Sequence, residues 1–292
     1  MNILITGATG FIGQNLIESI KTVHNIYIYA RPSSNLDIIG LNYNVCFETD
    51  ISKIRTYLIE NKIEGIVHLA SLFLSSHNES QIKDLIKSNI YLGASLLEAS
   101  INTNVKWFLN TGTFWQHYIP DSKKYCPVNL YAATKQAFID IARYYVETTS
   151  IRFVTLKICD TFGKNDSRPK IFNLWESNSQ KGDVLDMSSG EQYIDIIHIE
   201  DVVRGFIHLI DMLNSDAILE PEYALYAKER YTLKDLCEIY EKTTGKRLNI
   251  NWGARPYRIR EVMNPWIAGT RLPEWMPQHD IIQGIIKSMQ KE

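Results

Sequence analysis

The chain has 292 residues, of which 45% are hydrophobic and 22% are charged, a composition that can form a sizeable core and excludes extensive disorder. The formal net charge of −2 excludes the strongly basic surface that is typical of nucleic-acid-binding proteins. No apolar run reaches the roughly 18 residues of a membrane-spanning helix and no signal-peptide pattern opens the chain, so we expect a cytoplasmic protein without nucleic-acid or membrane partners.

Short apolar runs alternate with helical patterns over the first 157 residues. This alternation predicts an α/β protein with a Rossmann-type, doubly wound parallel sheet that carries helices on both faces. We expect strands at residues 3–5, 25–30, 65–70, 105–110 and 152–157, and helices at residues 11–21, 82–100 and 130–148.

The pattern changes after residue 160, which we take as a domain boundary. Residues 1–160 are expected to form the sheet domain, and residues 161–292 a smaller mixed cap on the C-terminal edge of the sheet, with residues 190–215 returning to the sheet domain. Residues 162–169 have the composition of a loop. Further helices are expected at 171–178, 199–213 and 233–244, and the last third carries Trp252, Arg255, Tyr257, Arg258, Trp266 and Trp275.

The cysteines lie far apart and form no CxxC pair. This spacing disfavours a zinc site or a disulfide framework. We expect no metal, and free thiols at Cys46, Cys126, Cys159 and Cys237.

Three glycines with GxxGxxG spacing lie between the first strand and the first helix, at Gly7, Gly10 and Gly13. The first glycine allows a tight turn, the second lets the backbone approach a pyrophosphate, and the third lets the helix pack on the strand. Phosphates at this place would meet free N–H groups and the positive end of the helix dipole. The turn predicts a dinucleotide site, and the alternative is a tight turn without a ligand.

The end of the second strand indicates which dinucleotide is bound. NAD-binding proteins of this type carry an acid there for the ribose hydroxyls. In this chain no carboxylate occurs from the start of the second strand, at residue 25, until Asp37. Arg31 can pair with a 2′-phosphate, and Ser33, Ser34 and Asn35 can donate hydrogen bonds to it. We therefore expect NADP(H); otherwise Arg31 is an ordinary solvated loop residue.

Asp50 and Ile51 follow another short apolar run. Asp50 can accept a hydrogen bond from the adenine amino group while Ile51 packs on the ring. Equally, Asp50 can be the N-cap of a helix over residues 51–60.

Tyr131 and Lys135 are four residues apart, so they share one face of the expected helix. A tyrosine has a reference pKa near 10, and a nearby cation lowers it. We expect Lys135 to lower the pKa of Tyr131, which would act as an acid–base group, unless the pair is an exposed tyrosine and a solvated lysine.

Thr113, after the fourth strand, is the best hydroxyl to hold a substrate oxygen; its alternative role is to stabilise a local turn.

Together these residues resemble the extended short-chain dehydrogenase/reductase family of nucleotide-sugar epimerases, dehydratases and reductases. The likeness runs from residue 1 to at least residue 262. It is carried by residues 6–13, 67–71 and 195–202 and by Asn89, Thr113, Tyr131 and Lys135.

The resemblance implies a Rossmann domain with a sugar-binding cap, and redox chemistry at Thr113, Tyr131 and Lys135. It also implies a homodimer through the helices at about 82–100 and 130–148. The cofactor contacts expected from the pattern and the resemblance are Gly7, Thr9, Gly10, Phe11, Ile12, Gly13, Arg31, Ser33, Ser34, Asn35, Asp50, Ile51, Leu69, Ala70, Ser71, Asn89, Thr111, Tyr131, Lys135 and Ile158.

Departures from the family pattern narrow the reaction. The 4,6-dehydratases carry Asp-Glu directly after the catalytic threonine, but Phe114 and Trp115 stand here, so elimination of water is not expected. Two positions that commonly contact the substrate diphosphate differ as well, because they are Ile194 and Asp160. The nucleotide-sugar contacts are therefore expected among Ser71, Thr113, Phe114, Trp115, Asp160, Arg168, Lys170, Asn173 and Arg258, with His117 as a further wall of the sugar site unless the aromatic residues belong to the core.

Residues 111–118, 127–135 and 156–163 are most similar to the 4-ketoreductases that make 3,6-dideoxyhexoses, the CDP-paratose and CDP-abequose synthases. This likeness implies NADPH-dependent reduction at C4 of a nucleotide-diphospho-4-keto-deoxysugar, in deoxysugar biosynthesis for surface polysaccharide such as lipopolysaccharide O-antigen. An epimerase that uses the same residues is the main alternative. A non-catalytic NADP-sensing protein is a remote one, because such proteins commonly lose the tyrosine or the lysine.

Overall fold

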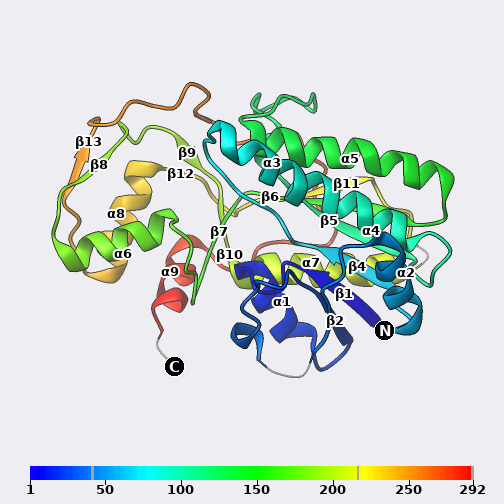
Figure 1. Ribbon diagram of the computed structural model, residues 1–292. Helices are drawn as coiled ribbons and strands as arrows, with labels where there is room; N and C mark the ends of the chain where they lie inside the picture. Colours follow the sequence, from blue (N-terminus) through cyan, green and yellow to red (C-terminus); the bar gives the residue numbers. More distant parts are fainter. Residues whose placement is uncertain (41–42, 216, 291–292) are drawn as a thin grey trace.

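A parallel sheet of seven strands lies at the centre of the larger body of the computed structural model, which describes residues 1–40, 43–215 and 217–290 (Figure 1). The strand order is β11-β6-β5-β4-β1-β2-β3. The order reverses between β1 and β4, where Rossmann-type sheets bind their ligands at the carboxyl ends of the strands. The strands are β1 (Asn2–Thr6), β2 (Asn25–Tyr29), β3 (Asn44–Cys46), β4 (Gly65–His68), β5 (Trp107–Thr113), β6 (Arg152–Ile158) and β11 (Glu222–Leu225).

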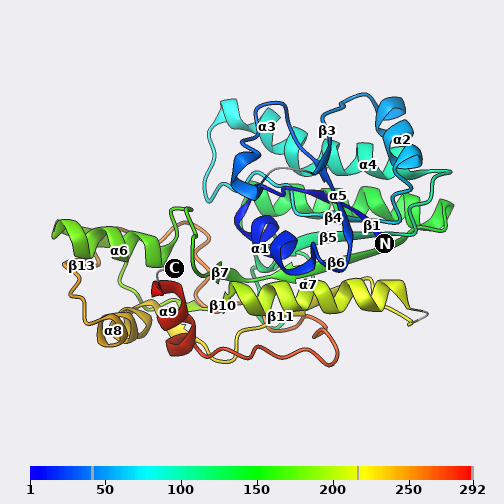
Figure 2. The same ribbon diagram turned by 90° about the horizontal axis from the view of Figure 1, so that it is seen from below.

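Helices cover both faces of this sheet, as the sequence predicts. Figure 2 shows α7 (Ile199–Asn214) on one side of the strands and α4 (Leu92–Ser100) and α5 (Leu130–Thr148) on the other. Buried aliphatic side chains of α1 (Phe11–Ile20) and α7 form one core cluster, and those of α2 (Ile51–Glu60), α4 and α5 form a second on the opposite face. The expected helix over 82–100 consists of α3 (Ile82–Ile86), a π-helical segment η3 (Lys87–Tyr91) and α4.

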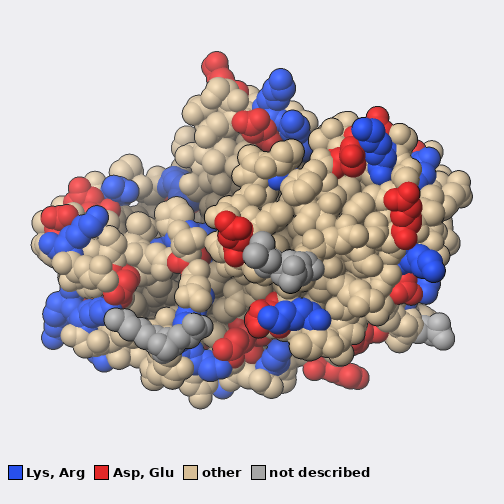
Figure 3. Space-filling model, turned by 60° about the horizontal axis from the view of Figure 1, so that its bottom comes forward, with Lys and Arg blue, Asp and Glu red and all other residues tan. Residues whose placement is uncertain are grey.

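A smaller lobe has its own core, built around Trp175, Leu236 and Tyr240. Figure 3 shows a hollow between this lobe and the larger body, with acidic and basic side chains intermingled over the visible face. The elements in or next to this lobe are α6 (Ile171–Lys181), α8 (Leu233–Thr244), α9 (Ile281–Met289), β7 (Asp160–Phe162), β8 (Leu185–Met187), β9 (Tyr193–Ile194), β10 (Ile196–His198), β12 (Tyr231–Thr232) and β13 (Ile250–Trp252). The remaining short helical turns are η1 (Asp37–Ile39), η2 (Glu79–Gln81) and η4 (Phe114–Gln116).

Several elements differ from the sequence-based expectation. The edge strands β3 and β11 and the helix α9 were not expected, and β5 continues to Thr113. Trp266 and Trp275 were expected in the cap but pack against the larger body: Trp266 lies with Phe114 and Tyr226, and Trp275 joins the core on the α7 face. The reason is that the chain returns after the cap, where the N–H of Ala224 in β11 donates to the carbonyl of residue 270 at 2.8 Å.

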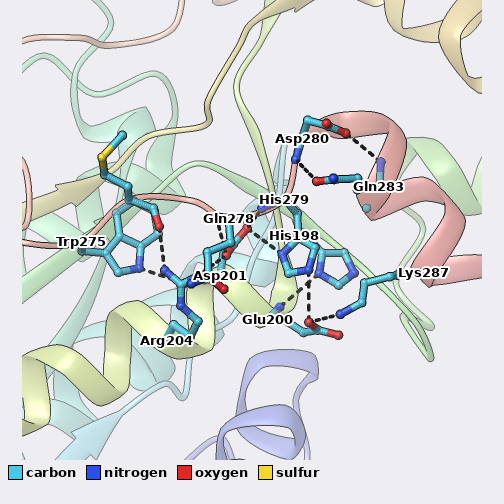
Figure 4. A network of polar contacts seen from close by, with 12 residues as sticks. His198, Glu200, Asp201, Arg204, Trp275, Gln278, His279, Asp280, Gln283 and Lys287 are labelled. Carbon is cyan, nitrogen blue, oxygen red and sulfur yellow. Dashed lines mark hydrogen bonds and ion pairs between the residues drawn. The ribbon is translucent and has the colours of Figure 1, made fainter.

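The C-terminal segment is held to α7 by a buried carboxylate, that of Asp201 (Figure 4). This carboxylate accepts hydrogen bonds from the backbone N–H groups of Gln278 and His279, both at 2.9 Å. It also lies 3.0 Å from His279 Nδ1 and forms an ion pair with Arg204 at 3.1 Å. Removing this carboxylate would leave the Arg204 guanidinium and two backbone N–H groups without their acceptor, and such a loss is strongly destabilising.

Next to this anchor, His198, Glu200 and His279 offer possible ligand atoms within 4.8 Å of one another. The carboxylate of Glu200 already contacts the ammonium group of Lys287 and lies 3.3 Å from His279 Nε2. His198 Nδ1 accepts a bond from the N–H of Glu200 at 3.4 Å, at the start of α7. We therefore describe the group as a polar network that joins α7 to α9. Within the described residues, no helix is both long and apolar enough to cross a bilayer.

Candidate active site

The glycine turn between β1 and α1 has the geometry that its spacing predicts. Gly7 has a φ of +69°, and a Cβ there would lie 2.6 Å from the backbone nitrogen of Ala70. A Cβ on Gly13 would lie 2.3 Å from the carbonyl oxygen of Gly7. The packing of the chain itself thus requires glycine at these two positions, so they alone do not prove a ligand.

Gly10 is the glycine of this turn that indicates a bound phosphate, because packing does not explain it. A Cβ there would meet a single neighbour, the carbonyl oxygen of Gly7 at 3.1 Å, so packing alone does not demand glycine. Gly10 is also the N-cap of α1 and provides no side-chain acceptor for the first N–H groups of the helix. Free N–H groups beside a bare backbone suit the approach of a phosphate.

The neighbouring strand ends offer further groups that fit a dinucleotide. Thr111, inside β5, has a buried hydroxyl without a hydrogen-bond partner among the described residues. Leu69 and Ala70, directly after β4, and Ile158, the last residue of β6, are half-buried.

The loop after β2 is exposed, as expected for residues that reach a ribose. Arg31 is exposed and forms no hydrogen bond or ion pair through its side chain with the described part of the chain. The side-chain oxygen of Asn35 accepts a bond from the N–H of Asp37 at 3.1 Å, and its expected role as a donor stays a prediction. Asp50 is the N-cap of α2 and accepts from the N–H groups of Ser52 and Lys53 at 2.9 and 3.2 Å, which is the second of the two expected roles.

Thr113, Tyr131 and Ser71 meet at the carboxyl end of β5. The phenol of Tyr131 lies near the hydroxyls of Ser71 and Thr113, and the Thr113 hydroxyl also accepts from the N–H of Trp115 at 3.3 Å. Burial raises the pKa of Tyr131 to about 12, a rise that the nearby Asp160 carboxylate supports and the hydroxyls of Ser71 and Thr113 oppose. The phenol is therefore a neutral hydrogen-bond donor at working pH.

Lys135 does not lower the pKa of Tyr131 here, and this corrects the expectation. Its side chain is buried, and burial lowers its own pKa to about 8. Burial lowers the pKa of His68 to about 3, with a further contribution from the charge of Lys135. Burial is the largest effect on the pKa of Tyr131, and Lys135 is not among its causes, so the phenol stays protonated.

The loop that carries Ser71 is fixed by Asn89, from the π-helical segment η3. Its side-chain oxygen accepts from the Ser71 hydroxyl at 3.1 Å and from the N–H of Leu72 at 2.7 Å. Its amide nitrogen donates to the carbonyl of Leu72 at 3.1 Å and to the hydroxyl of Thr134 at 2.9 Å. Asn89 was expected to contact the cofactor, but its amide holds a loop beside Tyr131.

Phe73 was missed by the sequence analysis and lies beside the phenol. Its ring centroid is 5.0 Å from that of Tyr131 and 5.4 Å from that of Trp115. Two cations approach this aromatic pair: Lys170 Nζ lies 4.3 Å from the Phe73 centroid and the Arg258 guanidinium 5.6 Å from the Trp115 centroid. The only signal in the sequence was that Phe73 closely follows the expected segment 67–71.

Phe114 and His117 belong to the core, which corrects their expected place at the sugar site. Phe114 is buried against Tyr226 and Trp266. His117 stacks on Trp266 at a centroid distance of 4.0 Å and accepts from the buried ammonium of Lys157 at 2.8 Å. β11 and the returning chain cover these rings, and neither was predicted. Trp115 is half-buried and stays at the site.

Arg168 and Asn173 hold the loop after β7 together. Arg168 is bound to Asp166 at 2.7 Å and donates to the carbonyl of Thr161 at 2.8 Å. The amide of Asn173 donates to the carbonyls of Asp166 and Arg168. Both side chains were expected to bind the substrate, yet these donors are engaged within the loop. The Arg168 guanidinium also lies 4.4 Å from the Phe11 centroid, which links this loop to the glycine turn.

Lys170 and Arg258 are the cations that remain next to the aromatic pair. Lys170 forms an ion pair with Asp160 at 2.7 Å, and Arg258 forms one with Glu261 at 3.2 Å. The Arg258 side chain is 55% exposed. Exposed ion pairs are weak, so a phosphate can compete for Arg258 at low cost.

The fold is of the Rossmann type, with a glycine turn between β1 and α1 and a tyrosine, Tyr131, near the carboxyl end of β5. The chain belongs to the NAD dependent epimerase/dehydratase family, whose model matches residues 3–220. A nicotinamide dinucleotide is the cofactor typical of this family.

Curated relatives cover nearly the whole chain. A CDP-abequose synthase of Salmonella muenchen is 28% identical over 98% of this chain and 96% of its own. A UDP-glucose 4-epimerase of Caenorhabditis elegans is 25% identical over 93% of this chain and 92% of its own.

Among solved structures, the UDP-glucose 4-epimerase of Thermotoga maritima has a TM-score of 0.86 at 19% identity, covering 99% of this chain and 97% of its own. The UDP-glucuronic acid 4-epimerase of Bacillus cereus, in complex with UDP-glucuronic acid and NAD, has a TM-score of 0.84 at 21% identity, covering 99% of this chain and 98% of its own. At these identities the likeness shows the fold alone.

Proposed function

We propose that this protein reduces the C4 keto group of a nucleotide-diphospho-4-keto-deoxysugar with NADPH. A CDP-linked 4-keto-3,6-dideoxyhexose is the favoured substrate, and the reaction would serve deoxysugar biosynthesis for a surface polysaccharide in the cytoplasm. The observation that carries the proposal is the placement of the Tyr131 phenol, on α5, near the hydroxyls of Ser71 and of Thr113 at the end of β5. Reduction of a ketone requires such a proton donor.

The proposed reaction consumes one hydride and one proton for each carbonyl. NADPH supplies the hydride when it is bound, and the protein supplies position and electric field. Tyr131 donates its proton to the oxygen of the reduced carbonyl, and Thr113 donates a hydrogen bond to the same oxygen. Ser71, whose hydroxyl donates to Asn89 at 3.1 Å, lies near the phenol and would help to position it.

The residues around the glycine turn fit a dinucleotide. The bare backbone at Gly10 and the free first turn of α1 would hold the pyrophosphate. The unpartnered hydroxyl of Thr111 and the ammonium of Lys135 would hold the nicotinamide half. Arg31, without an acid beside it on β2, would pair with the 2′-phosphate of NADPH.

The smaller lobe would bind the nucleotide, with Arg258 and Lys170 at the diphosphate. The CDP-abequose synthases support CDP as the nucleotide, because three of them from two genera match 91% or more of this chain. The domain division at residue 160 and the choice of CDP are parts of this proposal.

An epimerase is the second candidate, since UDP-glucose 4-epimerases are also similar over nearly the full chain. An epimerase regenerates its cofactor within one turnover, whereas a reductase consumes NADPH. The missing acid on β2 favours NADPH and therefore the reductase.

Replacing Tyr131 by phenylalanine tests the proposal. Tyr131→Phe should lower kcat by about 100-fold or more, because general acid catalysis contributes roughly 10²–10⁴-fold. The Kd for NADPH, measured by fluorescence titration, should change little. Turnover within about threefold of the wild-type rate would contradict the assigned role.

A further inference from the structure

Lys157, in β6, is a buried lysine that has no part in the proposed reaction so far. Its side chain is 2% exposed, and its ammonium group lies 2.6 Å from the carboxylate of Glu222 and 2.8 Å from His117 Nε2. Apolar residues of similar volume often stabilise a protein as well as a buried ion pair does, or better. Stability alone therefore gives no reason for a lysine at this position, and its contacts point to another role.

The stem of Lys157 lies beside the strand that ends in Thr113. Lys157 pairs with Gly112 in the register of β5 and β6, and a Cβ on Gly112 would lie 2.7 Å from Lys157 Cγ. The stem is thus packed against the residue that directly precedes Thr113. The ammonium group at its end reaches His117, which follows the short helical turn η4 after Thr113.

Both ring nitrogens of His117 are bonded. Burial lowers the pKa of His117 to about 4, with a further contribution from the charge of Lys157, so the imidazole is neutral at working pH. A lysine can only donate, so Nε2 accepts, and Nδ1 carries the proton and donates to the carbonyl of Lys124 at 3.2 Å. The ring also stacks on Trp266 with an interplanar angle of 8°. His117 is therefore fixed in one orientation.

The turn between Thr113 and His117 carries two residues of the proposed site. The N–H of His117 donates to the carbonyl of Phe114, and the N–H of Thr113 donates to Gln116 Oε1, both at 2.9 Å. The Thr113 hydroxyl accepts from the N–H of Trp115 at 3.3 Å. The orientation of this hydroxyl is therefore coupled to the turn whose far end His117 holds.

We propose that Lys157 is a positioning residue for the reduction. Through His117 it holds the turn that begins at Thr113, and it thereby keeps the Thr113 hydroxyl near the phenol of Tyr131. This inference rests on the proposed function and adds to it a residue that would act without touching the substrate. A misplacement of about 1 Å at the reacting groups can lower a rate by roughly 100-fold, so a loosened turn should reduce kcat.

Replacing Lys157 by methionine keeps an apolar stem and removes the ammonium group. Lys157→Met should lower kcat for CDP-4-keto-3,6-dideoxyglucose by roughly 10–100-fold. The KM for NADPH should stay within about twofold, because the turn after Thr113 would act on the substrate oxygen and not on the dinucleotide. The melting temperature should change little, since the freed Glu222 carboxylate is 38% exposed and can be solvated. A purely structural lysine would instead lower the melting temperature and leave kcat unchanged.

Two further variants complete the design. His117→Phe keeps an aromatic ring on Trp266 and removes the bond to Lys157. It should lower kcat as Lys157→Met does, and the double variant should lose no more than either single one, because the two residues act as a unit. Lys106→Met is the matched control, since Lys106 is also ion-paired to a glutamate but its side chain is 69% exposed. This control should have the wild-type kcat.

A surface cavity of about 490 Å³ reaches Lys157 and His117 beside α5, so a small amine can enter it. In Lys157→Ala, added propylamine replaces the carbons and the nitrogen that alanine lacks, and it should raise kcat severalfold. Tetramethylammonium at the same ionic strength has no N–H to donate and should not. Equal effects of the two ions, or no effect of propylamine, would contradict a role for the Lys157 N–H groups.

The outcomes distinguish this inference from the proposed function. If Lys157→Met retains the wild-type kcat, or if its effect and that of His117→Phe are additive, the inference is wrong while the reductase stands. If the wild-type protein does not oxidise NADPH with this sugar, the proposed function fails, and this inference fails with it.

Discussion

At the scale of single residues, the protonation of Tyr131 is the central feature. Burial raises the pKa of Tyr131 to about 12 and lowers that of Lys135 to about 8. The phenol is therefore protonated over the whole working range, which suits a donor of protons. Lys135 loses its proton as the pH rises through about 8. Lys135, and not the phenol, would therefore change the charge of the site in this pH range.

The spacing of Tyr131 and Lys135 was enough to predict that they share a helix, which is α5, and their catalytic roles stay a prediction. It was insufficient to predict the environment that sets their pKa values, because the burial comes from loops distant in the sequence. Ser71 and Phe73 reach the phenol through a loop fixed by Asn89. Such contacts depend on tertiary packing and leave no periodic pattern in the sequence.

Arg31 is the residue proposed to make the enzyme prefer NADPH to NADH. Arg31→Ala should lower kcat/KM for NADPH by roughly 10–100-fold, the worth of a charge-assisted hydrogen bond. The value for NADH should stay within about twofold, because NADH lacks the 2′-phosphate. Steady-state kinetics with both cofactors measures this, and equal losses for the two would contradict the assignment.

At the scale of elements, long periodic segments were predictable and short ones were not. The expected helix at 130–148 coincides with α5, and the expected helix at 199–213 is one residue shorter than α7. β11 has four residues and is recognisable only from its pairing with β6. Its presence explains why Phe114 and Trp266 are buried, so one missed strand also accounts for a misplaced site residue.

We expect the buried carboxylate of Asp201 to contribute to the stability of the C-terminal segment. Asp201→Ala leaves Arg204 and two backbone N–H groups without their acceptor. We expect a loss of about 3–5 kcal/mol in the free energy of unfolding, as when one partner of a buried ion pair is removed. For a chain of this size the melting temperature should fall by roughly 5–15 °C.

Asp211→Ala is the matched control for this prediction, because Asp211 is exposed on the same helix. It should shift the melting temperature by less than about 2 °C. Scanning calorimetry measures both variants. Equal small shifts would show that the anchor does not contribute to stability.

At the scale of the whole molecule, apolar side chains gather on the helices proposed to form a dimer. Ile82, Ile86, Tyr91, Ile141 and Tyr144 are exposed on α3, η3 and α5, and η3 packs beside α5 through the bond between Asn89 and Thr134. We predict a dimer by sedimentation velocity. Tyr144→Glu combined with Ile141→Glu should give monomers, since like charges would then face each other across the interface.

The matched control for the dimer is Ile218→Glu, at a residue that is 99% exposed outside these helices. It should leave the dimer intact. A wild-type protein that sediments as a monomer at micromolar concentration would contradict the proposed interface.

The reductase proposal is tested most directly by the stoichiometry of NADPH oxidation. The purified protein is mixed with NADPH and a limiting, known amount of CDP-4-keto-3,6-dideoxyglucose, and absorbance at the nicotinamide band is followed to completion while the sugar product is quantified. The account predicts one NADPH oxidised for each C4 alcohol formed. Conversion of a nucleotide sugar to its epimer with no net loss of NADPH would contradict it.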